Sequence, residues 1–208
     1  MYEILLLGYE FLSEFVPFLV VLMWLRYKKG KFTATYSKAH YILPVVFALY
    51  IMAVFHITGV GTVYDAMTVE FEEMKERINL IPFSQEIDVI GYLLNIVMFV
   101  PFGFLVPLIW KEMGKLSHIL TTGFALSLLI ELSQLFSYRG TDVDDIILNT
   151  LGAVVGFLVY RVWDKATRSR FQLEGLKFSE LPAYILALYL GRFLLFHQVG
   201  LIDLIYGF

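Results

Sequence analysis

Six long apolar segments fill most of the chain and constrain its fold more than any other feature. They span residues 4–25, 41–60, 89–110, 119–136, 146–163 and 181–202. Each approaches the ~20 residues that an α-helix needs to cross roughly 30 Å of hydrocarbon. A bilayer holds no water to satisfy backbone N–H and C=O groups, so segments of this length cross it as helices. The sequence therefore predicts an all-α, polytopic transmembrane helical bundle.

The predicted number of spans is about six, with five as the fallback. Glu10 and Glu14 interrupt the first segment, and Arg192 interrupts the last. Composition agrees with a membrane protein: 59% of the 208 residues are apolar and the mean hydropathy is +0.72, whereas soluble domains are roughly 45–50% apolar. We expect a single membrane domain over residues 1–208.

Charge and cysteine content exclude several functions. A net charge of −3 provides no basic surface for nucleic acid, so we expect no nucleic-acid partner. The absence of cysteine excludes a thiolate metal site and a cysteine nucleophile. The sequence has no glycine-rich phosphate loop, HExxH zinc helix or GxSxG elbow. We therefore predict no cofactor and no metal, and the question of an enzymatic activity stays open.

Basic residues predict which loops face the cytoplasm, because cytoplasmic loops carry an excess of Lys and Arg. They gather after the first, third and fifth segments, at Arg26, Lys28, Lys29, Lys31 and Lys38, at Lys111 and Lys115, and at Arg161, Lys165, Arg168, Arg170 and Lys177. The intervening loops are mainly acidic. We therefore predict that the basic loops lie inside and that both termini lie outside.

Polar side chains within the apolar segments collect toward the predicted outer face. They are Glu10, Glu14, His56, Asn95, Glu131, Gln134 and Asn149, and Arg192 lies near the middle of the last segment. An ionisable group in a bilayer costs at least roughly 2.5–3.5 kcal/mol and normally faces the bundle interior or water. The economical interpretation is a shared polar cavity that opens outward.

Two of these groups have other interpretations. Glu10 and Glu14 are four residues apart on one helix face, so they could carry a proton or a cation. They could instead lie at the depth of the lipid headgroups. His56 alone is more typical of a helix-contact residue than of a ligand or base.

The most informative stretch runs from Ser127 to Asn149. Ser127, Glu131 and Gln134 have the spacing of one polar stripe on a helix. Asp142 or Asp144 can then cap the next helix, where a carboxylate complements the exposed N–H groups. Asp145 and Asn149 share a face of that helix. In the alternative interpretation, Arg139 pairs with these aspartates and the stripe only holds two helices together.

Short motifs in this region resemble a known family. They are NLIPF at 79–83, Asn95 followed by FVPFG at 99–103, SLLIELSQ at 127–134, RGTDVDD at 139–145 and NTLG at 149–152. In type and order they closely resemble the VanZ-like family of bacterial membrane proteins. The resemblance covers 79–162, which we take as a VanZ-like core, with 1–60 and 181–208 as additional helices. It implies the bacterial cytoplasmic membrane and a link to low-level resistance to the lipoglycopeptide teicoplanin.

The sequence leaves three functions open. The first is a binding or protective protein whose cavity engages membrane lipid, a lipid-linked cell-wall precursor or the lipoglycopeptide. The second is an enzyme on such a lipid, with Glu131 or Asp145 as catalytic candidates, aspartates holding Mg²⁺ and Arg139 pairing with phosphate. The third is a proton-coupled transporter. The predicted ligand-binding residues are Asn79, Asn95, Glu131, Gln134, Arg139, Asp142, Asp144, Asp145 and Asn149.

A small-residue pattern follows the last motif. Gly152 and Gly156 are spaced so that two helix backbones can approach closely in lipid. We expect them to pack inside the fold. An oligomer through this face is possible but not expected.

Overall fold

The computed structural model describes residues 2–28, 37–70, 75, 77–84, 88–137, 139–171, 173 and 175–197. Within this part of the chain, five helices are long and apolar enough to cross a membrane. They are α1 (Tyr2–Lys28), α2 (Ala39–Thr58), α5 (Val89–Ile109), α6 (Leu116–Gln134) and α7 (Val143–Thr167). The predicted helical membrane bundle is confirmed, at the fallback number of five spans.

The last predicted span is shorter than expected. Helix α8 (Glu180–Leu195) has 16 residues and lies alongside α1. Residues 198–202 of the predicted segment lie outside the described residues. The remaining elements are short: α3 (Val63–Thr68), η1 (Lys111–Met113), and the strands β1 (Ile78–Asn79) and β2 (Thr141–Asp142).

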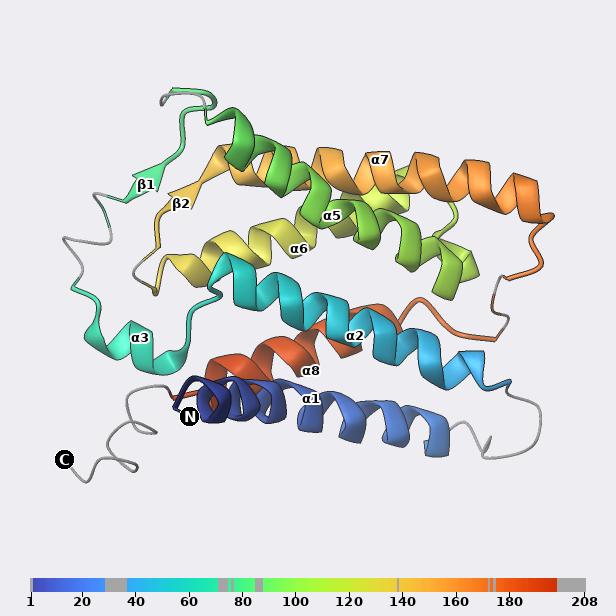
Figure 1. The fold of residues 1–208 in the computed structure, drawn as a ribbon, viewed down its shortest axis with the longest axis horizontal. Coiled ribbons are helices and arrows are strands. Elements are labelled where there is room, and N and C mark those ends of the chain that lie inside the picture. Colours follow the sequence, from blue (N-terminus) through green and yellow to red (C-terminus); the bar gives the residue numbers. More distant parts are fainter. Residues whose placement is uncertain are drawn as a thin grey trace.

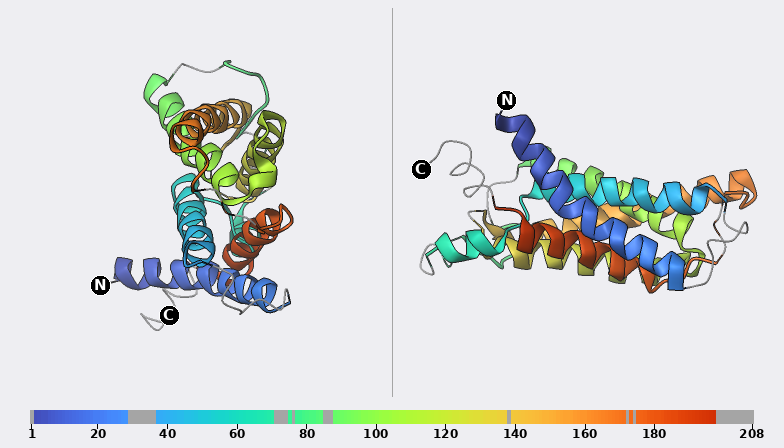
Figure 2. Two further views of the ribbon diagram at one scale, coloured as in Figure 1. Left: turned by 90° about the vertical axis from the view of Figure 1, so that its right-hand side faces the viewer. Right: turned by 90° about the horizontal axis from the view of Figure 1, so that it is seen from below.

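The helices run side by side, with their connections at two opposite ends. In Figure 1, α3, β1 and β2 lie at the left end, where α1 also begins, and the connection from α5 to α6 lies toward the right. Seen end-on in Figure 2, α5, α6 and α7 form one group, α1 and α8 form another, and α2 lies between them. Which end faces the outside stays a prediction.

Glycines allow α5 and α7 to pack at close range. A Cβ atom on Gly156 would lie 2.0 Å from the carbonyl oxygen of Val100, and one on Gly152 would lie 2.2 Å from that of Ile96. These separations are far below van der Waals contact, so a larger residue would push the helices apart. The small-residue face of α7 is therefore covered by α5 of the same chain.

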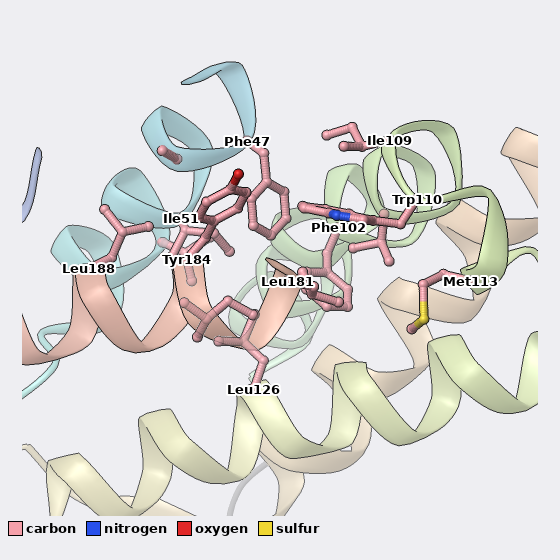
Figure 3. Packing of buried hydrophobic residues seen from close by; sticks show 14 of the residues in the cluster. Phe47, Ile51, Phe102, Ile109, Trp110, Met113, Leu126, Leu181, Tyr184 and Leu188 are labelled. Atoms are coloured by element: carbon pink, nitrogen blue, oxygen red, sulfur yellow. The ribbon is translucent and has the colours of Figure 1, made fainter. Parts of the chain in front are cut away.

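An aromatic cluster joins α2 to α5 and α8. Phe47 packs edge-on against Trp110, with ring centroids 5.2 Å apart, and Trp110 lies 6.1 Å from Tyr184. Figure 3 shows Phe47 and Ile51 of α2 facing Tyr184 of α8, with Phe102 beside them. All of these side chains are buried. The cluster connects the two helix groups through α2.

A buried ion pair ties the far ends of α1 and α8 together. Arg26 donates to Glu180 Oε2 at 2.9 Å, and both side chains are excluded from solvent. Arg26 also donates to the Tyr184 hydroxyl at 3.2 Å. From the sequence, Arg26 was expected to be one of the basic loop residues, but its side chain is buried in the interior.

Candidate functional site

Two motif loops that are far apart in the sequence form a parallel pair. Strand β1 pairs with β2 so that Asn79 lies opposite Asp142. The Asn79 amide donates to the Asp142 carboxyl oxygens at 3.1 and 3.2 Å. Its own oxygen accepts from the backbone N–H of Ile81 and from the Ser84 hydroxyl. The NLIPF turn and the RGTDVDD loop therefore form one unit.

Two aspartates fix the start of α7. Asp142 is the cap, and its Oδ1 accepts from the backbone N–H of Asp144 at 2.9 Å. Asp144 is buried and accepts from the Phe83 N–H at 2.8 Å and from the Tyr92 hydroxyl at 2.7 Å. Phe83 has φ of 53°, a conformation rare for a bulky residue. Its hydrogen bond to Asp144 holds the turn in this conformation.

Glu131 is buried, with 2% of its surface exposed, and bonds to backbone. Its Oε2 accepts from the N–H of Asp142 at 2.9 Å, and its carbonyl accepts from the Thr141 hydroxyl at 3.1 Å. Among the described residues, no ion pair joins Glu131 to Arg139. Glu131 is thus held by backbone and hydroxyl donors at the start of α7.

The polar stripe on α6 holds helices together. Ser127 accepts from the Asn149 amide of α7 at 2.9 Å, and the Gln134 amide donates to the Thr58 carbonyl of α2 at 2.7 Å. Asn149 thus faces α6. This agrees with the alternative in which the stripe joins helices, since Ser127 bonds to α7 and Gln134 bonds to α2.

A cavity of about 510 Å³ lies between α2 and α5, near the end of α6 and the start of α7. We call it the motif cavity. Its polar lining consists of Thr58, Asn95, Gln134, Arg139 and Asp145. The Asn95 amide donates to the Asp145 carboxyl group. The structure thus brings together four of the predicted binding residues here.

The remaining predicted residues support this cavity from outside its lining. Asn79, Asp142 and Asp144 build the loop pair and the start of α7, as described above. Glu131 and Asn149 are buried behind it. Grouping polar residues by their depth in the sequence cannot tell residues that line the cavity from residues that hold the surrounding loops and helices, because both groups lie at the same ends of the helices.

Arg139 lies between two cavities. Besides the motif cavity, it lines a second cavity of about 610 Å³, together with Thr62, Asp65 and Arg192. Its guanidinium donates to the Ile57 carbonyl at 2.8 Å, and it forms no ion pair with a carboxyl group in the described residues. A Cβ atom on Gly59, whose φ is 64°, would lie 3.0 Å from Arg139 Cδ. A glycine here suits both the backbone turn and the arginine that lies over it.

A second group of polar side chains lies on the other side of α2. We call Glu10, Glu14, His56 and Arg192 the acid cluster. Arg192 donates to Glu10 and, at 2.8 Å, to Glu14. His56 Nδ1 lies 2.9 Å from Glu10 Oε1. These carboxyl groups are buried in the protein, and their depth in the membrane stays a prediction. Their contact with Arg192 was not predicted from the sequence, although a lone arginine in an apolar segment was the available signal.

The described residues offer little support for a bound metal. In the part of the chain that the structure describes, no group of three or more His, Asp or Glu side chains is arranged to hold a metal ion. The aspartates at the start of α7 instead accept hydrogen bonds from amide and hydroxyl groups. The geometry adds nothing to the Mg²⁺ alternative.

The apolar helices and the polar cavity at their ends define a multi-pass membrane protein. Residues 47–164 match the family described as VanZ/LLP1. The chain is also similar to Protein VanZ of Enterococcus faecium, with 30% identity over 119 residues, which cover 57% of this chain and 73% of that protein. The chain belongs to the VanZ family of bacterial membrane proteins. No solved structure matches it.

The extent of the family match separates the two polar regions. It begins within α2 and includes every residue of the motif cavity's lining. It leaves out Glu10 and Glu14 of α1 and Arg192 of α8. The motif cavity is therefore the family's part of the molecule, and most of the acid cluster is not.

Proposed function

We propose that this chain lies in the bacterial cytoplasmic membrane and binds the anionic headgroup of a lipid-linked cell-wall component in the motif cavity. By doing so, it lowers susceptibility to teicoplanin. The link to this lipoglycopeptide is what membership of the VanZ family implies. The antibiotic itself is the alternative occupant of the same cavity.

The observation that carries this proposal is that most of the hydrogen-bond donors of Arg139 have no acceptor among the described residues. Its guanidinium has five N–H donors, and a single backbone carbonyl, that of Ile57, accepts from it among the described residues. An arginine without a carboxylate partner, set between two cavities, is suited to pair with phosphate through two parallel hydrogen bonds.

The walls of the motif cavity favour an amphiphile over a free anion. Ile57, Leu94 and Val97 line it, and each is at least 60% exposed. These side chains belong to helices that cross the membrane, so they face lipid. A ligand with a polar head and an apolar chain can place its head beside Arg139 and its chain along this wall.

The orientation of the cavity can be tested directly. The chain has no cysteine, so single cysteines introduced at Leu80 and at Lys115 report on the two ends. We expect an impermeant thiol reagent to label position 80 and not position 115 on whole cells, because the loop of Lys115 belongs to the predicted cytoplasmic set. Labelling of position 115 alone would reverse the orientation and refute an outward cavity.

Headgroup binding can be measured with purified protein in detergent. We expect native mass spectrometry to detect a polyprenyl phosphate bound in preference to the matching polyprenol. Arg139→Gln should abolish this preference, and Lys115→Gln, which removes a positive charge at the other end, should not. Equal binding of both lipids by the unchanged protein would contradict the proposal. Preferential binding of teicoplanin would assign the cavity to the antibiotic.

Resistance supplies the second test. Membrane abundance, melting temperature and teicoplanin susceptibility are measured for Glu131→Gln, Arg139→Gln and the double variant, in a strain where the unchanged protein confers a phenotype. We expect a stable Arg139→Gln protein that has lost the phenotype. Normal resistance in a stable double variant would sink the proposal. Conversion of the lipid to a new product by the pure protein would instead identify an enzyme.

A further inference from the structure

The acid cluster is enclosed by three helices. Glu10 and Glu14 project from one face of α1, Arg192 reaches them from α8, and His56 reaches Glu10 from α2. Glu14 has 1% of its surface exposed and Arg192 has 5%. Arg192 Nε also donates to the Val60 carbonyl at 2.9 Å, which fixes the guanidinium in place. The geometry is that of a built site in the interior, formed by side chains from three separate helices.

The charges of this cluster do not balance. Two carboxylates face one guanidinium, and within the described residues His56 is the other titratable side chain in contact with them. With His56 neutral, the cluster carries one excess negative charge in a medium of low polarity. Such a charge is strongly unfavourable unless a proton or another cation neutralises it.

One oxygen marks where the missing positive charge belongs. Glu14 Oε1 accepts from Arg192, but Glu14 Oε2 is buried and has no hydrogen-bond partner in the described part of the chain. Both oxygens of Glu10 lie within 3.0 Å of His56 Nδ1. Glu14 is therefore the less satisfied of the two carboxyl groups as an anion.

A route to this group leads through a cavity of about 310 Å³ between α1 and α2. Glu10, Glu14 and His56 form its polar part, and Leu7, Phe11 and Met52 are among its apolar walls. The His56 side chain is 56% exposed, whereas the carboxyl groups are covered. His56 lies two residues before the end of α2, where a proton can pass between the aqueous face of the membrane and the buried acids.

We infer that the acid cluster is a proton-binding site, in which Glu14 takes up and releases the proton and His56 exchanges it with the surroundings. On uptake, an O–H bond forms at the Glu14 carboxylate and the cluster becomes neutral with Arg192 and Glu10 still paired. On release, the proton leaves through His56. The site is independent of the ligand proposed for the motif cavity.

Infrared difference spectroscopy on the full-length protein in lipid nanodiscs tests this inference. A pH titration is expected to show the C=O stretch of a protonated carboxyl group that disappears as the pH rises. Glu14→Gln should remove this signal. Glu14→Asp should shift it, which keeps the test valid if the first variant folds poorly. Glu3→Gln, which changes an exposed carboxyl group on the same helix, is the control and should retain it.

Thermal stability provides a second measurement. A site that binds a proton only in the folded protein favours folding at low pH, so the melting temperature of the unchanged protein should fall as the pH rises. Glu14→Gln, which is permanently uncharged, should show a flatter dependence.

Three outcomes would overturn the inference. One is a titrating signal that survives Glu14→Gln and is lost in Glu10→Gln or Glu131→Gln. Another is the absence of any titrating carboxyl signal. The third is a melting temperature that depends on Na⁺ concentration and not on pH, which would make the cluster a site for a metal cation.

Discussion

Carboxyl groups in the motif region and in the acid cluster have different kinds of partner. In the motif region, Glu131, Asp142, Asp144 and Asp145 accept hydrogen bonds from backbone N–H, amide and hydroxyl groups. No ion pair among the described residues involves these carboxyl groups. In the acid cluster, by contrast, the carboxyl groups share one guanidinium. The positive charge of Arg192 is therefore neutralised by carboxyl groups of the cluster, whereas that of Arg139 in the motif region is not paired with a carboxyl group among the described residues.

The two regions meet at the end of α2, where the comparison is sharpest. Arg139 donates to the Ile57 carbonyl and Arg192 to the Val60 carbonyl. Arg139 thus bonds to the last turn of α2 and Arg192 to the segment just after it, near a helix terminus where positive charge is favourable. One is exposed between two cavities, and the other is buried against two acids. The charge of Arg192 is matched by carboxyl groups of the protein, whereas Arg139 has no such partner among the described residues and is the arginine that we propose pairs with a ligand.

The largest expected effect is the loss of Arg192. Arg192→Gln leaves two buried carboxyl groups without their cation, which should destabilise the fold by about 3–5 kcal/mol. Arg139→Gln loses one exposed hydrogen bond and should cost about 1 kcal/mol. Unfolding in detergent by heat or denaturant measures both. Similar losses of stability at the two positions would contradict the contrast between a paired and an unpaired arginine. Recovery of stability on adding Glu10→Gln and Glu14→Gln to Arg192→Gln would support it.

A steric change in the family's part of the molecule should have the next largest effect. Gly156→Ala places a methyl group against the backbone of α5 and should destabilise the fold by about 1–3 kcal/mol. Gly8→Ala is the matched control, because nothing lies within 4 Å of a Cβ atom there. Melting temperatures in the same detergent compare the two. Equal stability of both variants would mean that α5 and α7 are not packed as closely as the structure has them.

A smaller effect is expected at the hydrogen bond that joins α5 to the motif loop. Tyr92→Phe removes the hydroxyl that donates to Asp144 and should cost about 0.5–1.5 kcal/mol. Tyr27→Phe serves as the control, since Tyr27 is 76% exposed. If Tyr92→Phe and this control have the same free energy of unfolding, the hydroxyl of Tyr92 does not stabilise Asp144. The contrast between neutral partners in the motif region and a charged partner in the acid cluster would then fail.

The fold could be predicted from the sequence because span length and apolar content alone require membrane helices. The pairing of the motif loops was also within reach, since alternate loops must lie at the same side. The actual partners were not. Glu131 bonds to the backbone of Asp142 instead of Arg139, and Arg192 reaches across to α1. Spans that are apolar on every face do not reveal how each helix is rotated, so they cannot say which polar groups meet.

Gln134→Leu should change stability least and still affect binding. The Gln134 amide donates to the Thr58 carbonyl, but its own oxygen is buried without a partner in the described residues. A leucine removes that unsatisfied oxygen while it leaves Thr58 without a donor, so the net change should stay within about 1 kcal/mol. Because Gln134 lines the motif cavity, loss of its amide should weaken polyprenyl phosphate binding by roughly two- to tenfold.

Ser127→Ala on the same helix is the control for this last variant. Ser127 bonds to Asn149 and does not line the motif cavity, so its loss should leave lipid binding unchanged. Native mass spectrometry and melting temperatures on both variants give the two readouts. Weaker binding in Ser127→Ala than in Gln134→Leu would mean that the stripe on α6 acts only by holding helices together. A loss of lipid binding in Gln134→Leu but not in Ser127→Ala would show that Gln134 also contacts the ligand. One face of α6 would then serve both to join helices and to bind the ligand.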